Sequence, residues 1–375
     1  MKYFLSAGEA SGDLHASQLI NALRLIDRSG EFTFLGGDLM AEAVGKAPAI
    51  HYRRMAYMGF SEVMRHLPEI LTNLSTAKKA IRDYKPDAVI LVDYPSFNFK
   101  LAKEAVRLGI PVYYYIAPKV WAWKEWRVKT LRALMRHIYC ILPFEVEYFH
   151  SKGLDNVTYV GNPSLEEVDR KLAQEDLPQA LIPYEGKKVL ALVPGSRLGE
   201  IRANLPVMET VAKRHPDMTA LVSGAPSIPM EVYSQYTTLP IVTGCTLQLM
   251  RMSTAALVTS GTATLECALV GTPQVACYRS SGSKAFYNIM KHFIKAPFVT
   301  LPNLIAGREV IPEMLMHMCA PDPVDAQLCR ILPGQPGRQE QLDGYSLVRE
   351  RLATTPAAAT TAALLYDDLV RYRSE

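Results

Sequence analysis

Two carboxylates stand where apolar, strand-like runs end, and both could take a proton from a hydroxyl. Asp93 follows the run at residues 88–92, and Glu9 follows the run at residues 2–7. A carboxylate in a largely apolar surround has a raised pKa, which suits a general base. The alternative for Asp93 is a turn-forming cap before Pro95, and the residues alone leave the two readings even. For Glu9 we favour a functional role.

The segment at residues 8–13 carries Gly8 and Gly12, which let the backbone turn tightly and approach a ligand closely. The helix expected behind them would add free N–H groups. Acidic side chains would repel a phosphate, so contact with sugar hydroxyls or proton transfer is the better expectation. The alternative is that Ser11 caps the helix while Asp13 stabilises its dipole, and this reading competes strongly for Asp13.

A second group of residues has the chemistry to bind a diphosphate. Residues 194–199 join a strand-like run to a helix-like run. Their backbone amides, the Ser196 hydroxyl and the Arg197 guanidinium could all hold phosphate oxygens. A glycine turn such as the one at Gly195 is weak evidence alone, and the arginine within it carries more weight.

The segment at residues 259–266 repeats this pattern, because it follows a strand-like run and begins a helix-like one. Ser260, Gly261 and Thr262 could bind phosphate oxygens at that helix N-terminus. Glu266 lies about one turn later and could accept hydrogen bonds from ribose hydroxyls. The alternative is a capping box, but that motif needs a spacing of three, and Thr262 and Glu266 are four apart. The spacing favours the ribose.

These segments need a scaffold that presents strand ends along one edge, and the chain alternates strand-like and helix-like runs. Strands separated by helices predict parallel sheets, in which ligands bind at the carboxyl ends of the strands. The pattern stops in a polar stretch at residues 172–188 and then restarts. It predicts two Rossmann-like halves with a ligand cleft between them, and one larger doubly wound sheet is the alternative. The expected strands are at residues 2–7, 88–92, 112–116, 138–142, 189–193, 219–222, 255–258 and 274–276.

We therefore expect an α/β fold with an N-terminal domain at residues 1–171 and a C-terminal domain at residues 172–352. Helices are expected at residues 14–26 and 200–215, each after a glycine turn. The last segment, residues 353–375, has a helical composition, and we expect it to return to the first domain.

The composition limits the class of protein. The formal net charge of +4 is too weak to indicate a nucleic-acid partner. The six cysteines contain no CxxC pair, so we expect free thiols and no metal site. The first residues are too short an apolar run for a signal peptide, and no stretch reaches the about 20 apolar residues that cross a bilayer. We therefore expect a protein that stays inside the cell, where it can still touch a membrane.

Residues 58–71 carry apolar side chains at helical spacing, and basic residues such as Arg53 and Arg54 flank them. The residues alone favour a helix packed on the core. The alternative is an interfacial helix whose apolar side enters the acyl region while basic residues meet lipid headgroups. The apolar residues are Phe60, Val63, Met64, Leu67, Ile70 and Leu71.

Several long motifs, in one order and over most of the chain, resemble the lipid-A-disaccharide synthase family, whose members are inverting glycosyltransferases with the GT-B fold. Motifs in a fixed order are far more specific than any single glycine turn. They are GEASGD at 8–13, Pro118 with VWAW at 120–123, LPFE at 142–145, PGSR at 194–197, SGTATLE at 260–266 and LPNLIAGR at 301–308.

The resemblance implies transfer of 2,3-diacylglucosamine from UDP-2,3-diacylglucosamine to 2,3-diacylglucosamine 1-phosphate. The products would be UDP and a β(1→6)-linked disaccharide 1-phosphate, a precursor of lipid A in the lipopolysaccharide of Gram-negative bacteria. The family uses no catalytic metal, and we expect no cofactor. It acts on the cytoplasmic face of the inner membrane, which raises the expectation that residues 58–71 dock on lipid. A homodimer is kept as an open alternative to a monomer.

The resemblance also implies roles for individual residues. Asp93 would be the base for the acceptor hydroxyl, Glu9 a second important carboxylate, and Arg197 the counter-charge of the leaving group. Asn303 would contribute to activity. The donor-binding residues would be Gly195, Ser196, Arg197, Ser260, Gly261, Thr262, Glu266 and Asn303. The acceptor loop would comprise Gly8, Ser11, Gly12, Asp13 and Asn98.

Two positions depart from the pattern of some relatives. Ser96 stands where they have a second aspartate, so Asp93 is the single carboxylate at this strand end. Lys119 replaces a small polar residue and is a candidate contact for the acceptor phosphate. Two other functions stay open: another GT-B enzyme, such as a UDP-N-acetylglucosamine epimerase or a peptidoglycan-precursor transferase, and a non-catalytic nucleotide-sugar binding protein.

Overall fold

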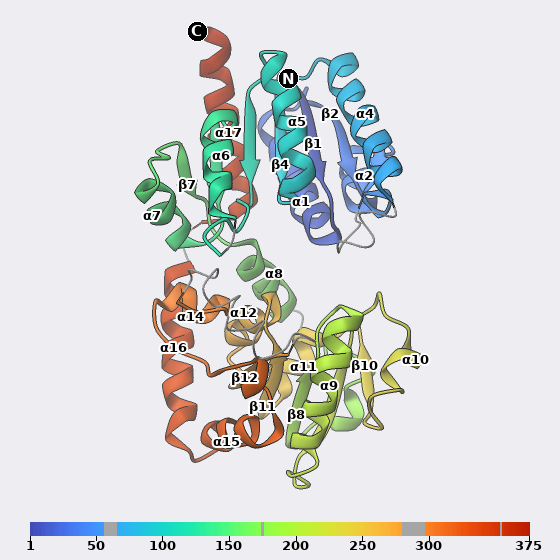
Figure 1. Cartoon of the computed structure of the whole chain (residues 1–375), viewed down its shortest axis with the longest axis vertical. Coiled ribbons are helices and arrows are strands. Elements are labelled where there is room, and N and C mark those ends of the chain that lie inside the picture. The colour runs from blue at the N-terminus through green and yellow to red at the C-terminus, as the bar shows by residue number, and fades with distance from the viewer. Residues whose placement is uncertain (56–65, 123, 174–175, 280–296, 353–354) are drawn as a thin grey trace. The chain divides into compact units, whose positions relative to one another are not determined.

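The computed structural model covers the chain of 375 residues and describes all of it except residues 56–65, 123, 174–175, 280–296 and 353–354 (Figure 1). The chain divides into two compact units. The first comprises Met1–Pro163 with Thr354–Glu375, and the second comprises Ser164–Ala353. Each unit is a parallel sheet with helices on its faces, as the alternating pattern predicts.

The first unit is built on a seven-stranded sheet in the order β3-β2-β1-β4-β5-β6-β7, and every neighbouring pair is parallel. The central strand β4 is buried at all its positions, which explains its unbroken apolar sequence. The strand order reverses between β1 and β4. The strands are β1 Lys2–Ala7, β2 Glu31–Gly36, β3 Ile50–His51, β4 Ala88–Val92, β5 Val112–Tyr115, β6 His137–Cys140 and β7 Val157–Tyr159.

Two apolar clusters cover the two faces of this sheet. One joins the sheet to α4, α5, α6 and α7, and the other joins it to α1, α2 and α17. The 3-10 turn η1 precedes α4, and η2 precedes α6. The helical elements are α1 Ala10–Ile26, α2 Asp38–Val44, η1 Tyr52–Arg54, α4 Leu67–Tyr84, α5 Pro95–Arg107, η2 Glu125–Arg127, α6 Val128–Leu134, α7 Pro143–Ser151 and α17 Ala357–Ser374.

The C-terminal helix α17 packs in the first unit, beside α1. Its apolar side supplies Leu365 and Leu369 to the core, which are both fully buried. Asp368 on the same helix accepts hydrogen bonds from Arg136 (2.6 Å) and from the Tyr113 hydroxyl (2.7 Å). Apolar packing and these polar contacts together hold the end of the chain against the sheet.

The second unit repeats the plan with a six-stranded parallel sheet in the order β10-β9-β8-β11-β12-β13. The strands are β8 Val189–Val193, β9 Thr219–Gly224, β10 Ile241–Thr243, β11 Ala255–Thr259, β12 Gln274–Tyr278 and β13 Glu313–Leu315. The helical elements are α8 Pro163–Leu172, η3 Ile182–Tyr184, α9 Leu198–Ala212, α10 Met230–Tyr233, α11 Thr246–Met252, α12 Thr262–Leu269, α14 Leu301–Ala306, η4 Met316–Met318, α15 Pro321–Ile331 and α16 Pro336–Leu352.

The boundary between the units differs from the expected one. The polar stretch at 172–188 suggested a break after residue 171, but α8 belongs to the second unit. Asp169 on α8 is bound by Arg349 of α16, and the carbonyl of Leu172 accepts from Arg251 (3.1 Å). These contacts hold α8 to the second unit, and a sequence pattern does not reveal such partners because they lie far away in the chain.

Candidate active site

Asp93 lies directly after β4 and adopts an unusual backbone conformation. Its φ is +46° and that of Tyr94 is +47°, a left-handed region that costs non-glycine residues about 1–3 kcal/mol each. Two hydrogen bonds fix the turn, because the carbonyl of Asp93 accepts from the Tyr114 hydroxyl (2.5 Å) and from the Asn98 side-chain amide (2.7 Å). The fold thus holds Asp93 in a strained position at the carboxyl end of the sheet.

The environment of the Asp93 carboxyl favours its neutral form. Burial raises its pKa, while the nearby charge of Lys119 and a hydrogen bond to the backbone of Tyr94 act in the opposite direction. A carboxylate with a raised pKa is a stronger proton acceptor than an exposed one. This is the electrostatic property that the sequence suggested for a general base.

Glu9 follows β1, the strand next to β4, where the order of the sheet reverses. Ala7 and Val92 pair at the ends of these strands, so the two carboxylates begin neighbouring turns. The turns touch, because a Cβ atom added to Gly8 would lie 2.2 Å from the ring of Tyr94. Ligands of doubly wound sheets bind at this reversal point. Gly8 is thus needed for close packing between the two turns.

Asn98 was expected in the acceptor loop, and the structure corrects this. The side chain is fully buried, its Oδ1 accepts from the Ser6 hydroxyl (2.7 Å), and its Nδ2 donates to Asp93 O (2.7 Å). Asn98 therefore joins the ends of β1 and β4 and does not face a ligand. It is a positioning residue for the Asp93 turn.

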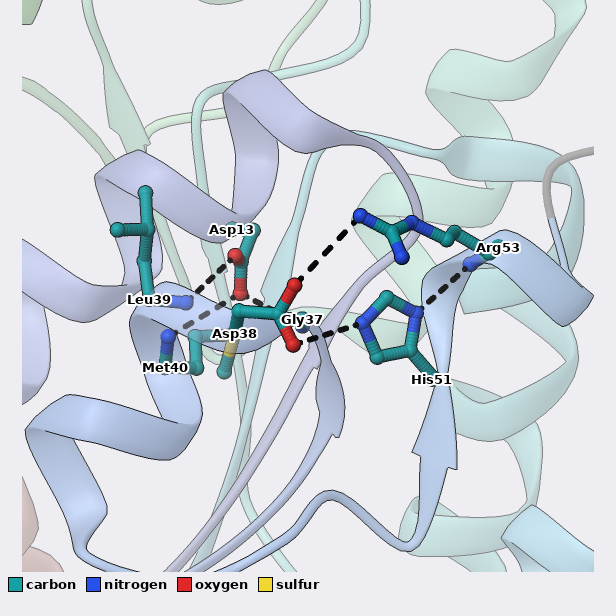
Figure 2. Close-up of polar contacts among 7 residues, drawn as sticks. All are labelled: Asp13, Gly37, Asp38, Leu39, Met40, His51 and Arg53. Atoms are coloured by element: carbon teal, nitrogen blue, oxygen red, sulfur yellow. Dashed lines mark hydrogen bonds and ion pairs between the residues drawn. The ribbon is translucent and has the colours of Figure 1, made fainter.

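Asp13 was also expected to face the acceptor, and its contacts again indicate a structural role (Figure 2). The carboxylate accepts from the backbone N–H groups of Gly37 (2.6 Å), Leu39 (3.1 Å) and Met40 (3.2 Å), and the residue is 3% exposed. These groups lie at the start of α2, which has no side-chain cap of its own. Asp13 therefore caps a neighbouring helix across the fold.

The helix after β1 starts earlier than expected, at Ala10 rather than residue 14. Glu9 is its N-cap residue, so Ser11 is exposed in the first turn and does not cap the helix. Gly12 packs close to β1, because a Cβ atom there would lie 3.3 Å from that of Ala7. Ser11 is exposed and Glu9 is half-buried at this strand end.

One buried carboxylate at the same edge was not recognised in the sequence. Glu145 lies in the first turn of α7, is 1% exposed, and accepts from the indole N–H of Trp121 (3.0 Å) and from Leu142 N–H (3.2 Å). Burial raises its pKa to about 7, although the charge of Lys119 opposes the shift. Glu145 therefore anchors the loop that follows β5, which carries Lys119. The LPFE motif was the only available signal.

In the second unit, the predicted diphosphate turn follows β8 as expected. Gly195 has φ +106°, which favours glycine, and Arg197 is the N-cap residue of α9 with 65% of its side chain exposed. The carboxylate of Glu200 accepts from the backbone N–H groups of Ser196 (3.1 Å) and Arg197 (3.3 Å). It also meets the Arg197 guanidinium at 3.3 Å. An internal anion therefore occupies the groups predicted to hold a diphosphate.

The second predicted anion turn follows β11 and starts α12, as the pattern suggested. Gly261 and Thr262 are exposed there, and Ser260 is half-buried. Glu266, one turn into α12, lines a pocket of about 350 Å³ together with Thr246 and the α8 residue Lys171. Burial raises the pKa of Glu266, and Lys171 opposes that shift. The pocket lies wholly within the second unit and offers a carboxylate to a polar ligand.

Asn303, predicted among the donor-binding residues, has its side chain engaged within the fold. It is fully buried, its Nδ2 donates to Ile311 O (2.9 Å) and Glu313 Oε1 (3.0 Å), and its Oδ1 accepts from Val310 (2.7 Å) and Ile311 (2.9 Å) N–H groups. All its hydrogen-bonding positions are used. Asn303 therefore holds the segment after α14 in place, and its contact with the donor stays a prediction.

Metal ligands do not gather at the predicted residues in the part of the chain that the structure describes. The one group of three potential ligands there comprises His215, which follows α9, and Asp325 and Cys329 of α15. Asp325 is already bound by His215 (2.7 Å) and by Arg214 (3.2 Å).

Solved structures share this architecture over almost the whole chain. CalG4, the calicheamicin glycosyltransferase, has a TM-score of 0.61 at 15% identity and covers 99% of this chain and 98% of its own. A UDP-GlcNAc 2-epimerase from Neisseria meningitidis, bound to UDP-GlcNAc, has a TM-score of 0.57 at 15% identity, with 99% and 100% covered. Such identities show the fold alone, which is GT-B.

Proteins of known activity match this chain at much higher sequence identity than these solved structures do. The lipid-A-disaccharide synthase of Myxococcus xanthus (strain DK1622) is 39% identical over 95% of this chain and 94% of its own. That of Syntrophus aciditrophicus (strain SB) is 35% identical, with 97% of both chains covered. The family model described as lipid-A-disaccharide synthetase matches residues 3–364. These relatives are glycosyltransferases. They support a glycosyltransferase and do not favour the epimerase or the binding protein that the sequence left open. The chain belongs to the lipid-A-disaccharide synthase family and is a glycosyltransferase of lipid A biosynthesis.

Proposed function

We propose that the chain transfers 2,3-diacylglucosamine from UDP-2,3-diacylglucosamine to 2,3-diacylglucosamine 1-phosphate, with inversion at the anomeric carbon and without a metal or cofactor. The products are UDP and the β(1→6) disaccharide 1-phosphate. Family membership supports the substrates, and one structural observation supports the mechanism. A carboxyl group with a raised pKa stands in a fixed, left-handed turn at the reversal point of the first sheet.

Asp93 acts as the base in this reaction. It takes the proton of the acceptor 6-hydroxyl while that oxygen bonds to the anomeric carbon of the donor and the bond to the UDP oxygen breaks. Glu9, at the neighbouring strand end, hydrogen-bonds sugar hydroxyls and is the alternative base. Because Tyr114 and Asn98 hold the Asp93 turn, little reorganisation is needed before proton transfer.

The second unit holds the donor. Glu266 accepts hydrogen bonds from the ribose hydroxyls in the pocket lined by Thr246 and Lys171. Arg197 and the start of α12, at residues 260–262, stabilise the negative charge that develops on the departing UDP. Glu200 has to leave the amides of residues 196–197 before a diphosphate can use them, because two anions cannot share those donors.

Asp93→Asn tests the assignment of the base. A general base contributes about 10²–10⁴-fold to the rate, so turnover should fall by that factor while UDP binding stays unchanged. Glu9→Gln is assayed beside it, and Asp83→Asn removes an exposed carboxylate on α4 as the control. Near-normal turnover of Asp93→Asn, with a large loss in Glu9→Gln, would transfer the role to Glu9.

We also propose that the first unit docks on the cytoplasmic face of the inner membrane. Leu71 is 52% exposed on α4, Ile70 is half-buried, and the side chains of Arg53 and Arg54 are 72% and 69% exposed. Apolar and basic groups together suit an anionic lipid surface. Phe60, Val63 and Met64 lie outside the described residues, as does the side chain of Leu67. Among the described residues, no helix is long and apolar enough to cross a membrane.

Co-sedimentation with vesicles that contain anionic phospholipid tests the docking. Leu71→Ser should reduce the bound fraction, while Leu25→Ser should not, since Leu25 is 82% exposed on α1 and far from the segment in sequence. Equal binding of both variants would return residues 58–71 to a packing role. Light scattering of the same preparations tests the expectation of a homodimer.

A further inference from the structure

Arg127 is a buried cation without a counter-ion among the described residues. It ends η2, at the carboxyl edge of the first sheet, and is 8% exposed. Within the described part of the chain, its guanidinium makes one hydrogen bond, from Nη2 to the Ser96 hydroxyl oxygen (3.0 Å), and its buried Nε has no partner there. Burial of an uncompensated charge is costly, and it lowers the pKa of Arg127. The fold therefore keeps a buried positive charge beside Ser96 at a cost in stability.

The neighbours of Arg127 position the guanidinium but do not neutralise it. The rings of Phe99 and Trp126 lie 5.8 and 5.6 Å away, in the range of a cation–π contact. Burial lowers the pKa of Lys124, and the nearby charge of Arg127 lowers it further. Positive charge thus accumulates at this place, as in a site for an anion.

Arg127 and Lys119 are each connected to the turn that carries the proposed base. Ser96, the partner of Arg127, lies in the first turn of α5, three residues after Asp93. Lys119 is exposed and acts electrostatically on the Asp93 carboxyl. An anion bound by Arg127 and Ser96 would therefore be held beside Asp93, in the same unit and at the same edge of the sheet.

We propose that Arg127 and Ser96, with Lys119 and Lys124 at the rim, bind the phosphate monoester of the acceptor and so direct its hydroxyl to Asp93. This inference rests on the proposed function. A guanidinium fork matches two phosphate oxygens, and the phosphate supplies the missing counter-charge. In the acceptor, one hexose ring separates the phosphate from the reacting hydroxyl, so a phosphate fixed at Arg127 orients the ring between the two groups.

The test compares two acceptors, 2,3-diacylglucosamine 1-phosphate and the same sugar without its phosphate. Wild-type protein should prefer the phosphorylated acceptor in kcat/KM by about 100-fold, a typical effect of a charge-assisted pair. Arg127→Gln should reduce this preference to about 10-fold or less by slowing only the phosphorylated acceptor. Lys129→Met, which removes an exposed cation from α6, should keep the wild-type preference.

The two acceptors also separate recognition from structural damage. A merely structural Arg127 would lower kcat/KM for both acceptors equally and leave the preference intact, and this result would overturn the inference. If Arg127→Gln does not fold, the preference for the phosphorylated acceptor is measured in Lys119→Met and Lys124→Met instead. An unchanged preference in both variants would likewise overturn the inference. A wild-type protein that makes no disaccharide from either acceptor would instead refute the proposed function.

Discussion

The side-chain amide of Asn98 donates a hydrogen bond to the backbone carbonyl of Asp93, with 2.7 Å between Nδ2 and O. The same side chain accepts from the Ser6 hydroxyl, so one buried amide joins the ends of β1 and β4. A strained backbone needs such support, because a turn with positive φ relaxes when its hydrogen bonds are removed. Asn98 thus determines where the proposed base stands.

Asn98→Ala should therefore lower kcat by about tenfold or more and cost about 2–4 kcal/mol of stability, since it leaves buried groups unpaired. Asn156→Ala is a matched control, because Asn156 also holds two carbonyls, those of Met135 and Arg136, in the same unit. Its loss should reduce stability while kcat is retained. Steady-state kinetics and urea unfolding check both, and equal kcat losses would contradict the positioning role.

The pH dependence of turnover should report the Asp93 carboxyl. Burial raises its pKa and Lys119 lowers it, so removal of the lysine charge should raise the pKa further. The base works when deprotonated, so kcat/KM should rise with pH through this pKa, and Lys119→Met should move that rise to higher pH. Lys119→Arg, which keeps the charge, should leave it in place. A rise unaffected by Lys119→Met would belong to another group.

The strands that carry the site could be predicted from the sequence because their signal is local. β1, β4 and β8 are buried along almost their whole length, β4 and β8 read as unbroken apolar runs, and each of the three predicted ranges matches the observed one. Glu9 and Asp93 were found because they follow these strands, Asp93 directly after β4 and Glu9 after Gly8 at the end of β1. The shorter or more polar strands, such as β2 with Glu31 at its start, gave no comparable signal.

The roles of the buried polar residues could not be predicted, because their partners are distant in the chain. Asp13 binds amides 24 to 27 residues away, and Asn98 binds the hydroxyl of Ser6 across 92 residues. A polar residue near a glycine turn resembles a ligand-binding residue until its contacts are known. Arg127 escaped notice for the opposite reason, since a lone arginine beside a tryptophan has no distinctive pattern.

Asn303 should matter for stability more than for donor contact. Its amide satisfies four buried groups between residues 303 and 313, so Asn303→Ala should cost about 3 kcal/mol, measured by urea unfolding. Gln339→Ala removes an exposed amide that bonds only Asp343 and should change stability little. A variant that is fully stable yet binds UDP poorly would show that Asn303 meets the donor directly.

Glu145 should make the stability of the protein fall as pH rises. Its folded-state pKa is raised to about 7 from an ordinary value of 4.5, so the folded state holds the proton more tightly. The resulting stabilisation is complete below about pH 4.5 and is lost as pH rises through 7. Between pH 5.5 and 8 wild-type protein should lose about 2 kcal/mol more than Glu145→Gln. Parallel pH curves for the two proteins would exclude Glu145 as the cause.

Glu200 should compete with the donor for the diphosphate turn. Its carboxylate accepts from the N–H groups of Ser196 and Arg197 and meets the Arg197 guanidinium, which are the groups proposed to hold the diphosphate. UDP must displace this anion, so part of its binding free energy is spent on the exchange. Glu200→Gln keeps an oxygen that can cap α9 but removes the charge.

This variant should therefore bind UDP about tenfold more tightly, because a neutral amide is a weaker competitor for cationic and N–H donors than a carboxylate. Glu231→Gln, at an exposed position of α10, changes the net charge of the same unit equally and should leave UDP affinity unaltered. Titration calorimetry with UDP measures both variants. If Glu200→Gln instead weakens binding, the carboxylate orders the turn for the donor, and tight UDP binding depends on its capping of α9.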